Sequence, residues 1–232
     1  MNKLFGICII GLLGGCKLNH AAPTGAETTG VVRALGVAAN FEDAVVDALP
    51  DGWKIVETNG TGTPATWKVV ESGGKDPNRC VALTETKNRG ATFNVLLSKS
   101  EIGADCELSI KVRADGGAED QGGGVLWRAS GANDYYVARW NPLEKNLRTY
   151  KVERGRRTML SSVDVEADPK EWHELGIRAR GDEYEISFDR KRVAIVDDAT
   201  FLGAGHFGLW TKADATTSFD DLRVAWTEIT ER

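Results

Sequence analysis

The feature that most constrains the fold is a two-residue alternation of apolar and polar side chains. In residues 106–113, Leu108, Ile110 and Val112 alternate with charged or hydroxyl side chains. Successive side chains of a strand point to opposite faces, so this pattern predicts a strand with one buried face. Residues 183–188 repeat the pattern, and after a turn at 189–191 it resumes at 193–196, which predicts a β-hairpin.

The same signals recur along the chain and no segment has a helical period over three turns. Further strands are expected at residues 67–70, 81–84, 92–97, 124–128, 135–140, 147–152, 159–165, 172–180, 207–211 and 222–226. The 26 glycines suit many tight turns between them. We therefore expect one all-β domain, a sandwich or barrel, over residues 39–228.

The N-terminus is typical of an export signal. Lys3 precedes an apolar run at residues 4–13, which is too short to cross a bilayer, and the run ends in Leu13-Gly14-Gly15-Cys16. This is the pattern of a lipobox, so residues 1–15 are expected to be removed and Cys16 to be the lipid attachment site. An ordinary secretory signal cut near Ala21 is the alternative.

The expected location is the cell envelope of a bacterium. Lys17 follows Cys16, where an aspartate would retain a lipoprotein at the inner membrane, so an outer-membrane lipoprotein facing periplasm or exterior is favoured. Residues 16–38 lack periodicity and are expected to form a flexible tether. The formal net charge is −5 with no long basic run, which excludes nucleic acid as the partner. The arginines of residues 154–157 are interpreted as a solvated hairpin tip.

Cys80 and Cys106 remain in the domain after the signal is removed. Outside the cytosol they could form a disulfide that closes a loop of about 25 residues and contributes on the order of 3 kcal/mol. Two buried free thiols are the alternative, and the sequence leaves both open.

Several segments together resemble a known superfamily. Gly-Val-Leu-Trp-Arg at 124–128, the long stretch 134–148, Glu171-Trp172-His173, and residues 188–191, 208–214 and 219–222 are similar to concanavalin A-like jelly rolls. Laminin-G-like domains and the 3-keto-disaccharide hydrolase domain family are the nearest groups. The resemblance implies a two-sheet antiparallel β-sandwich with ligands on a concave face or at a sheet edge. The Gly-Asn-Ser-Gly turn of the hydrolase group is replaced by Gln121-Gly122-Gly123-Gly124, so the resemblance implies the fold more specifically than the activity.

One spacing of acids resembles a catalytic pattern. Residues 166–171 read Glu-x-Asp-x-x-Glu, as on the catalytic strand of family 16 glycoside hydrolases, where alternation places the acids on one face. Pro169 cannot donate to a central ladder, and the apolar residues that should separate the acids are missing. We expect a loop there, and no catalytic residue is assigned.

The aromatic strands carry the binding hypothesis. Trp127, Tyr135, Tyr136, Trp140, Tyr150 and Trp210 lie on expected strands, with Arg128, Arg139 and Lys212 among them. An arginine cannot sit unpaired in the core, so Arg139 should face a groove with Tyr135 on the same side. Trp127 and Trp140 are then core residues. The predicted ligand-binding residues are Arg128, Tyr135, Arg139 and Lys212, because rings and basic groups suit sugars.

Acids also gather near the two ends of the domain. Glu42 and Asp43 are close to the first expected strand, and Asp220 and Asp221 to the last. If the chain ends lie side by side, these carboxylates could bind structural Ca²⁺, since calcium takes several oxygen ligands. Unconnected surface acids are the alternative, and no other cofactor is expected.

The leading hypothesis is a membrane-anchored envelope protein whose jelly roll binds carbohydrate or a surface partner without catalysis. A glycoside hydrolase of the 3-keto-disaccharide type is the second possibility, and a structural sandwich without a small ligand is the third. Two carboxylates within about 10 Å in an aromatic groove would favour the enzyme.

Overall fold

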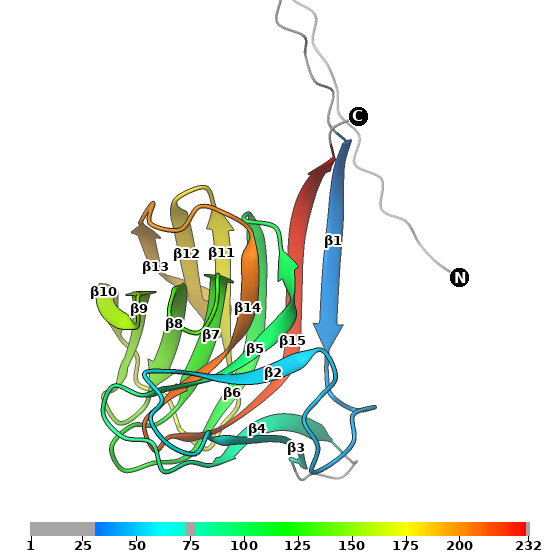
Figure 1. Cartoon of the computed structure of the whole chain (residues 1–232). Coiled ribbons are helices and arrows are strands. Elements are labelled where there is room, and N and C mark those ends of the chain that lie inside the picture. Colours follow the sequence, from blue (N-terminus) through cyan, green and yellow to red (C-terminus); the bar gives the residue numbers. More distant parts are fainter. Residues whose placement is uncertain (1–30, 73–77, 231–232) are drawn as a thin grey trace, which may run out of the picture.

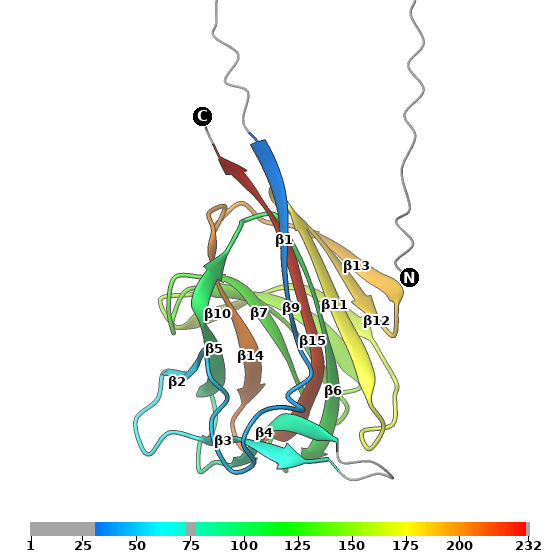
Figure 2. The ribbon, with the colours of Figure 1, turned by 90° about the vertical axis from the view of Figure 1, so that its right-hand side faces the viewer.

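The computed structural model describes residues 31–72 and 78–230. In this part of the chain there are fifteen strands and no helix, so the all-β prediction is confirmed. It follows that these residues contain no helix long and apolar enough to cross a membrane. The strands form two antiparallel sheets that pack face to face (Figure 2), as in a jelly-roll sandwich.

The sheets have eight and seven strands. The eight-stranded sheet has the order β13 (Lys191–Asp197), β12 (Glu183–Phe188), β11 (His173–Arg180), β6 (Cys106–Gly116), β15 (Thr216–Thr230), β4 (Arg79–Glu85) and β3 (Thr66–Glu71), and β1 (Val31–Ala39) also pairs with β15. The seven-stranded sheet has the order β10 (Arg156–Asp164), β9 (Asn146–Glu153), β8 (Tyr135–Asn141), β7 (Gly123–Ala129), β14 (Gly205–Lys212), β5 (Phe93–Ile102) and β2 (Trp53–Thr58).

The main core lies between the sheets and follows the alternation in the sequence. Leu108, Ile110 and Val112 on β6 are buried in it, opposite Trp127 and Trp140 of the other sheet. The polar residues between them on β6 face away from the core. The predicted inner faces of these strands are therefore confirmed.

A second apolar layer covers the outer face of the seven-stranded sheet. Tyr135 and Val137 belong to it, whereas their neighbours Tyr136 and Ala138 belong to the main core. All seven residues of β8 are consequently buried. The layer also contains Phe93, Val95, Leu97, Leu126, Ala129, Tyr150, Val152 and Trp210. A sheet apolar on both faces needs a cover on its outer side.

The two edges of this sheet approach one another, which provides part of that cover. Asn59 follows the edge strand β2, and Gly155 precedes the opposite edge strand β10. Asn59 Nδ2 donates to the Gly155 carbonyl at 2.9 Å and to the Ala91 carbonyl at 3.2 Å. These bonds join the rims across the outer face, so the sheet encloses a hollow.

The expected tether is partly wrong, because residues 31–38 belong to β1. This strand pairs with β15 from Val31 opposite Thr230 to Ala39 opposite Leu222. Figure 1 shows β1 and the end of β15 projecting together beyond the sandwich. The ordered domain therefore begins before residue 39. Cys16 and the rest of the predicted signal and tether up to residue 30 lie outside the described residues.

The predicted disulfide is not formed, since Cys80 and Cys106 are both buried free thiols. Cys80 contacts Ser218 of β15, whereas Cys106 lies opposite Trp226 of the same strand. Eight residues of extended chain separate these two positions, which corresponds to roughly 27 Å. The distance is far beyond the reach of a disulfide.

The acids at the chain ends do not assemble the predicted calcium site. The Glu42 carboxylate accepts from the Arg79 amide, Asp221 pairs with Lys111 at 2.6 Å, and Asp220 accepts from Asn78. Within the described ranges, no three His, Cys, Asp or Glu side chains converge in a way that could hold a metal ion. Asp43 borders a separate surface depression beside Phe41. Neighbouring protein groups, instead of one shared ion, bind Glu42, Asp220 and Asp221.

Candidate functional site

The floor of the hollow is a cluster of aromatic rings around one guanidinium. Arg157 of β10 places its Cζ atom 4.2 Å from the ring centroid of Tyr150, 5.1 Å from Phe93 and 6.0 Å from Trp210. The Phe93 and Trp210 centroids are 5.1 Å apart. A cation over several ring faces is electrostatically favourable, so the rings hold this side chain in place.

An open pocket lies over this cluster. Its volume is about 530 Å³, and its lining combines rim and floor: Gly90, Ala91, Phe93, Gly155, Arg156, Arg157 and Lys212. Pockets of this size suit small ligands. The walls at one end are the loops that Asn59 ties together.

The β8–β9 turn adds an arginine–glutamate cluster to the same face. Arg139 is only 2 % exposed and donates through Nη2 to Glu144 Oε2 at 2.7 Å and through Nη1 to Asn146 Oδ1 at 2.7 Å. Glu144 also accepts from Arg148 Nη1 at 2.9 Å. Because Asn141 Oδ1 accepts the Glu144 amide at 3.1 Å, the turn itself fixes this carboxylate in position.

A second acid, Asp120, comes from the β6–β7 loop. Its Oδ2 accepts from Lys212 Nζ at 2.7 Å and its Oδ1 from Asn141 Nδ2 at 2.8 Å. Asp214 positions this loop by accepting the amides of Ala118, Glu119 and Asp120. Asn141 thus contacts both acidic residues, through the Asp120 carboxylate and through the Glu144 amide.

The two carboxyl groups are shifted in opposite directions. Burial raises the pKa of Asp120, and the hydrogen bond from Lys212 offsets only part of that effect. Burial would also raise the pKa of Glu144, but the hydrogen bond and charge of Arg139 outweigh it and hold that pKa below its usual value. The surroundings therefore favour the neutral form of Asp120 and the ionised form of Glu144, and opposite shifts of this kind suit an acid–base pair.

Three of the predicted ligand-binding residues lie on this face. Arg139 and Lys212 contribute polar groups, as described above. Tyr135 shares their face as the alternation predicted, but it is fully buried. Its hydroxyl contacts Thr58 Oγ1 at 2.8 Å and accepts from Trp210 Nε1 at 3.1 Å, so Tyr135 supports the ring layer from below.

Arg128 is not a groove residue, and its prediction was wrong. Its side chain points between the sheets, where Nη1 donates to the Tyr184 hydroxyl and the Phe201 carbonyl, both at 2.9 Å. The strand is irregular here, because Arg128 has a φ of 51° and the pairing of β14 with β7 shifts register between His206 and Gly208. Simple alternation therefore fails at this position.

The sequence reasoning missed three site residues. Arg157 was expected in a solvated turn, but only Arg154 and Gly155 form the turn and Arg157 lies on the floor of the site. Asp120 and Glu144 lie outside strands, where alternation gives no information. The Glu-x-Asp-x-x-Glu segment is a loop, as predicted, and Glu166 pairs with Lys145 at 2.6 Å.

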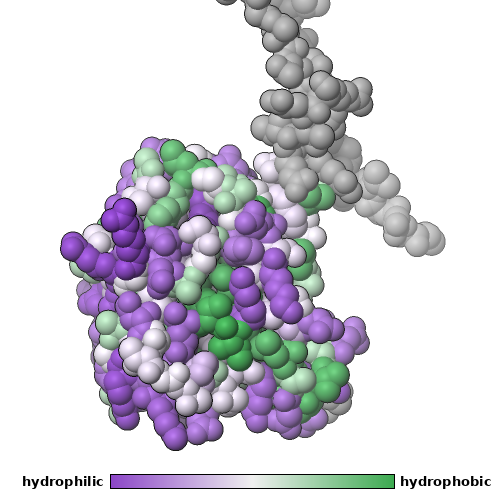
Figure 3. All heavy atoms as spheres, viewed as in Figure 1, coloured by the Kyte–Doolittle hydropathy of each residue, from purple (hydrophilic) through white to green (hydrophobic). Residues whose placement is uncertain are grey.

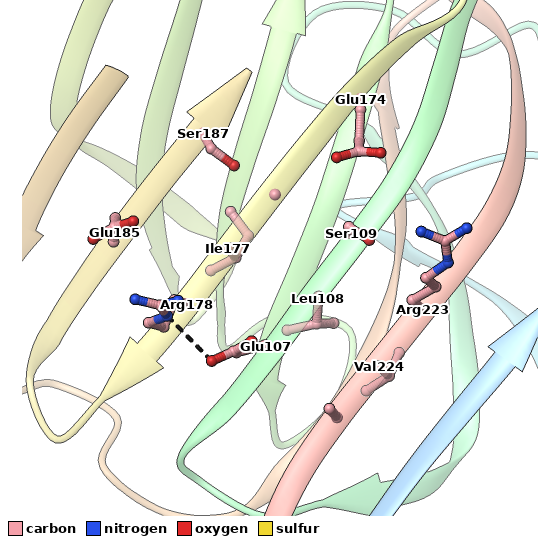
Figure 4. Close-up of a pocket in the computed structure, with 12 residues that line it drawn as sticks. Glu107, Leu108, Ser109, Glu174, Ile177, Arg178, Glu185, Ser187, Arg223 and Val224 are labelled. Carbon is pink, nitrogen blue, oxygen red and sulfur yellow. Dashed lines mark hydrogen bonds and ion pairs between the residues drawn. The ribbon is translucent and has the colours of Figure 1, made fainter. Parts of the chain in front are cut away.

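A second depression of about 330 Å³ lies on the outer face of the eight-stranded sheet (Figure 4). Its floor is low because Gly176 lies between Ser109 and Ser187 on adjacent strands. The acids around it are all paired with arginines: Glu107 with Arg178 and Arg180, Glu174 with Arg190, and Glu185 with Arg192. Small side chains between the paired acids explain the low floor of this depression, and Arg223 lies at its margin.

Figure 3, in the view of Figure 1, shows a mainly hydrophilic surface with separate hydrophobic areas at its top, in its middle and at its lower right. The aromatic floor residues contribute little to such a surface, since Phe93, Trp210 and Tyr150 are 2 %, 1 % and 4 % exposed. These three rings would therefore offer a ligand little direct contact.

Comparison with known proteins identifies similar chains. The family model described as "3-keto-alpha-glucoside-1,2-lyase-like domain" matches residues 46–225. No curated protein sequence matches the chain. Among solved structures, the carbohydrate-binding module CBM66 from Bacillus subtilis is similar, with a TM-score of 0.59 and 21% identity over 76% of this chain and 95% of that one.

Two further structures share the fold. The cellulose-induced protein Cip1 has a TM-score of 0.57 and 9% identity, covering 81% of this chain and 96% of that chain. Domain 4 of AbnA, a GH43 extracellular arabinanase from Geobacillus stearothermophilus solved in complex with arabinotriose, has a TM-score of 0.52 and 11% identity, covering 87% and 95%. These likenesses establish the jelly-roll fold.

Proposed function

Because the chain belongs to the family of 3-keto-alpha-glucoside-1,2-lyase-like domains, we propose that it binds carbohydrate on the outer face of its seven-stranded sheet. One observation carries this proposal: an open pocket of about 530 Å³ has Arg157 and Lys212 in its lining and an aromatic layer beneath them. AbnA domain 4, which has a similar fold, was solved with bound arabinotriose, and this supports a sugar as the ligand.

The site recognises sugar mainly through polar contacts. Guanidinium and ammonium groups donate to hydroxyl, keto or carboxylate oxygens, and Glu144 can accept from hydroxyls at the margin of the site. The rings beneath are too buried to act as stacking platforms. Their part is to hold Arg157 in one orientation, which lowers the entropic cost of binding.

Retention of polysaccharides by the purified full chain tests this proposal. Lys212→Gln, in the pocket, should weaken retention about tenfold. Lys191→Gln makes the same change on exposed β13 of the other sheet and should retain glycan like the unaltered protein. Failure to retain any glycan, or equal weakening by both substitutions, would contradict the proposal.

A second candidate function is cleavage of a 3-keto-α-glucoside by elimination across C1 and C2. Asp120 and Glu144, with pKa values shifted in opposite directions around Asn141, favour it. The ketone at C3 makes the C2 hydrogen acidic, so a carboxylate can remove that proton. The C2–H electrons form the C1=C2 double bond while the C1–O bond breaks, and the leaving oxygen takes a proton from the acid partner.

Basic side chains have a defined part in such a reaction. Lys212 and Arg139 can stabilise the negative charge that develops on the C3 oxygen. Incubation with a chromogenic 3-keto-α-glucoside should release the aglycone, and Glu144→Gln and Asp120→Asn should each slow release at least 100-fold. The exposed-acid substitution Glu183→Gln is the control. Release that persists in both acid variants would exclude this mechanism.

The location of the protein is part of the proposal. The sequence up to Cys16 supports a lipid anchor that holds the domain on the cell envelope, in the outer membrane. A fatty-acid analogue fed to expressing cells should label the chain, and Cys16→Ser should abolish labelling and release the protein from membranes. Membrane fractions separated by density should contain it with the outer membrane. Unchanged labelling of the variant would disprove attachment at Cys16.

A further inference from the structure

We infer that the carbohydrate bound at this face carries a carboxylate group, and that Arg157 is the side chain that binds it. This inference rests on the proposed function and narrows its ligand to acidic sugars, such as uronate residues. The inference rests on the position of Arg157 at the base of an open pocket. Among the residues that the structure describes, no acidic side chain pairs with it.

Arg157 differs from Lys212, Arg139 and Arg148, its neighbours on this face. Lys212 is paired with Asp120, and Arg139 and Arg148 share Glu144. Across residues 31–72 and 78–230, Arg157 has no hydrogen bond or ion pair, and its Nη1 atom is buried without a partner. Its close contacts are with the rings of Tyr150, Phe93 and Trp210.

The rings cover the guanidinium but cannot satisfy its hydrogen bonds. A buried donor without a partner is costly, and a cation over rings keeps its N–H groups directed outward in the guanidinium plane. Burial also lowers the pKa of Arg157, because the charged guanidinium has lost contact with water. Arg157 also lines the pocket, so a ligand there can supply acceptors to the guanidinium N–H groups that are not buried.

The charge balance of the site selects the kind of acceptor. Five basic side chains, Arg139, Arg148, Arg156, Arg157 and Lys212, lie around three acids: Asp120, Glu144 and Glu119, whose carboxylate accepts the amide of the pocket-lining residue Gly90. The local excess is two positive charges on a chain whose formal net charge is −5. An anion is therefore attracted here, in a field opposite to that of the molecule as a whole.

A carboxylate matches the geometry of the free guanidinium. Its two oxygens accept two parallel N–H groups, a bond about twice as strong as a neutral one. A hydroxyl of a neutral sugar would satisfy one donor and leave the charge unbalanced. Arg156 at the same rim reinforces the preference, while Glu144, whose side chain is 44 % exposed, remains available for hydroxyl groups of the same sugar.

Matched pairs of oligosaccharides test the inference directly. Each pair differs only at C6, as carboxylate or as hydroxymethyl: galacturonate with galactose, glucuronate with glucose, and mannuronate with mannose. Binding to the purified full chain is measured by calorimetry at low and high salt. In at least one pair, we expect the acidic member to bind at least tenfold more tightly at low salt, with a smaller preference at high salt.

Substitutions then assign the preference to one side chain. Arg157→Gln should remove the preference for the acidic member and leave weak binding of both, while Arg157→Lys should retain part of it. Arg154→Gln removes the same charge from the exposed turn three residues earlier and should leave the preference unchanged. Thermal melts show whether each variant is folded.

The outcomes separate this inference from the proposed function. Equal binding of acidic and neutral members by the unaltered chain would overturn the inference and leave carbohydrate binding intact. A preference that survives Arg157→Gln would overturn the role of Arg157. Inorganic phosphate and a sulfated oligosaccharide are included, and binding of either as tightly as the uronates would show a general anion site instead. Binding of no glycan at all would contradict the proposed function itself.

Discussion

Lys212 Nζ lies 2.7 Å from Asp120 Oδ2, in an ion pair whose side chains are 17 % and 5 % exposed. The pair joins β14 to the β6–β7 loop at the edge of the proposed site. Burial is the main cause that raises the pKa of Asp120. Lys212 offsets part of this effect because it stabilises the ionised carboxylate. This relationship links the charge of the site to the stability of the fold.

Lys212→Met should therefore destabilise the protein by about 3 kcal/mol at pH 8, because it leaves a buried carboxylate without its cation. The variant raises the folded-state pKa of Asp120 further above that of the unfolded chain. Its penalty should shrink as the pH falls through that folded-state value and the carboxyl becomes neutral. Urea unfolding at several pH values measures this. Lys212→Met with Asp120→Asn should recover most of the loss at pH 8, and a penalty independent of pH would contradict the account.

Glu144→Gln should also cost stability at neutral pH and cost less in acid, but for a different reason. The pKa of Glu144 is lowered in the folded state, so its charge contributes stability above the unfolded pKa. That contribution is lost as the pH falls from about 4.3 through the lower folded-state pKa. Because the carboxylate is 44 % exposed, the expected loss at pH 7 is only about 1 kcal/mol. The unfolding free energies of the variant and of the unaltered protein should converge in acid. If they diverge there, the ion pair of Glu144 with Arg139 does not stabilise the folded protein in this way.

Arg128→Leu should cost stability without changing glycan binding. The substitution leaves the Ala104 and Phe201 carbonyls and the Tyr184 hydroxyl without their donor, and we expect a loss of about 3 kcal/mol. Urea unfolding gives the loss, and glycan retention below the unfolding transition gives the binding. A folded Arg128→Leu protein that retains less glycan would show that Arg128 contributes to the binding site.

The thiols of Cys80 and Cys106 should stay unreactive in the folded protein. Burial raises the pKa of Cys80 to about 11 and that of Cys106 to about 12, so little nucleophilic thiolate exists at pH 8. Alkylation followed by peptide mapping should modify neither in buffer and both in denaturant, with or without a reducing agent. A peptide linked through both cysteines would show that the disulfide forms after all.

Much of the fold could be predicted because the chain follows period-two burial closely. Leu108, Ile110 and Val112 gave the inner face of β6, and the faces of Tyr135 and Arg139 on β8 followed from the same rule. The resemblance to 3-keto-disaccharide hydrolase domains is likewise confirmed by the match over residues 46–225.

The site could be predicted only where it lies on regular strands. Arg139 and Lys212 meet that condition, whereas Arg128 does not, because a positive φ turns its side chain inward. Asp120 depends on a loop held by Asp214, nearly a hundred residues away, and no local pattern reveals such a contact. A signal for Glu144 did exist, since a turn between Asn141 and Asn146 places it beside Arg139.

The bond between Asn59 and Gly155 limits how a long polymer could reach Arg157. The loops that it fastens form one wall of the pocket, so that side is a blind end. A chain cannot thread through and continue beyond the wall. A terminal unit or a short branch should therefore reach Arg157 more readily than an internal unit, and the number of chain ends in a polysaccharide, more than its total mass, would then determine how much of this protein it captures.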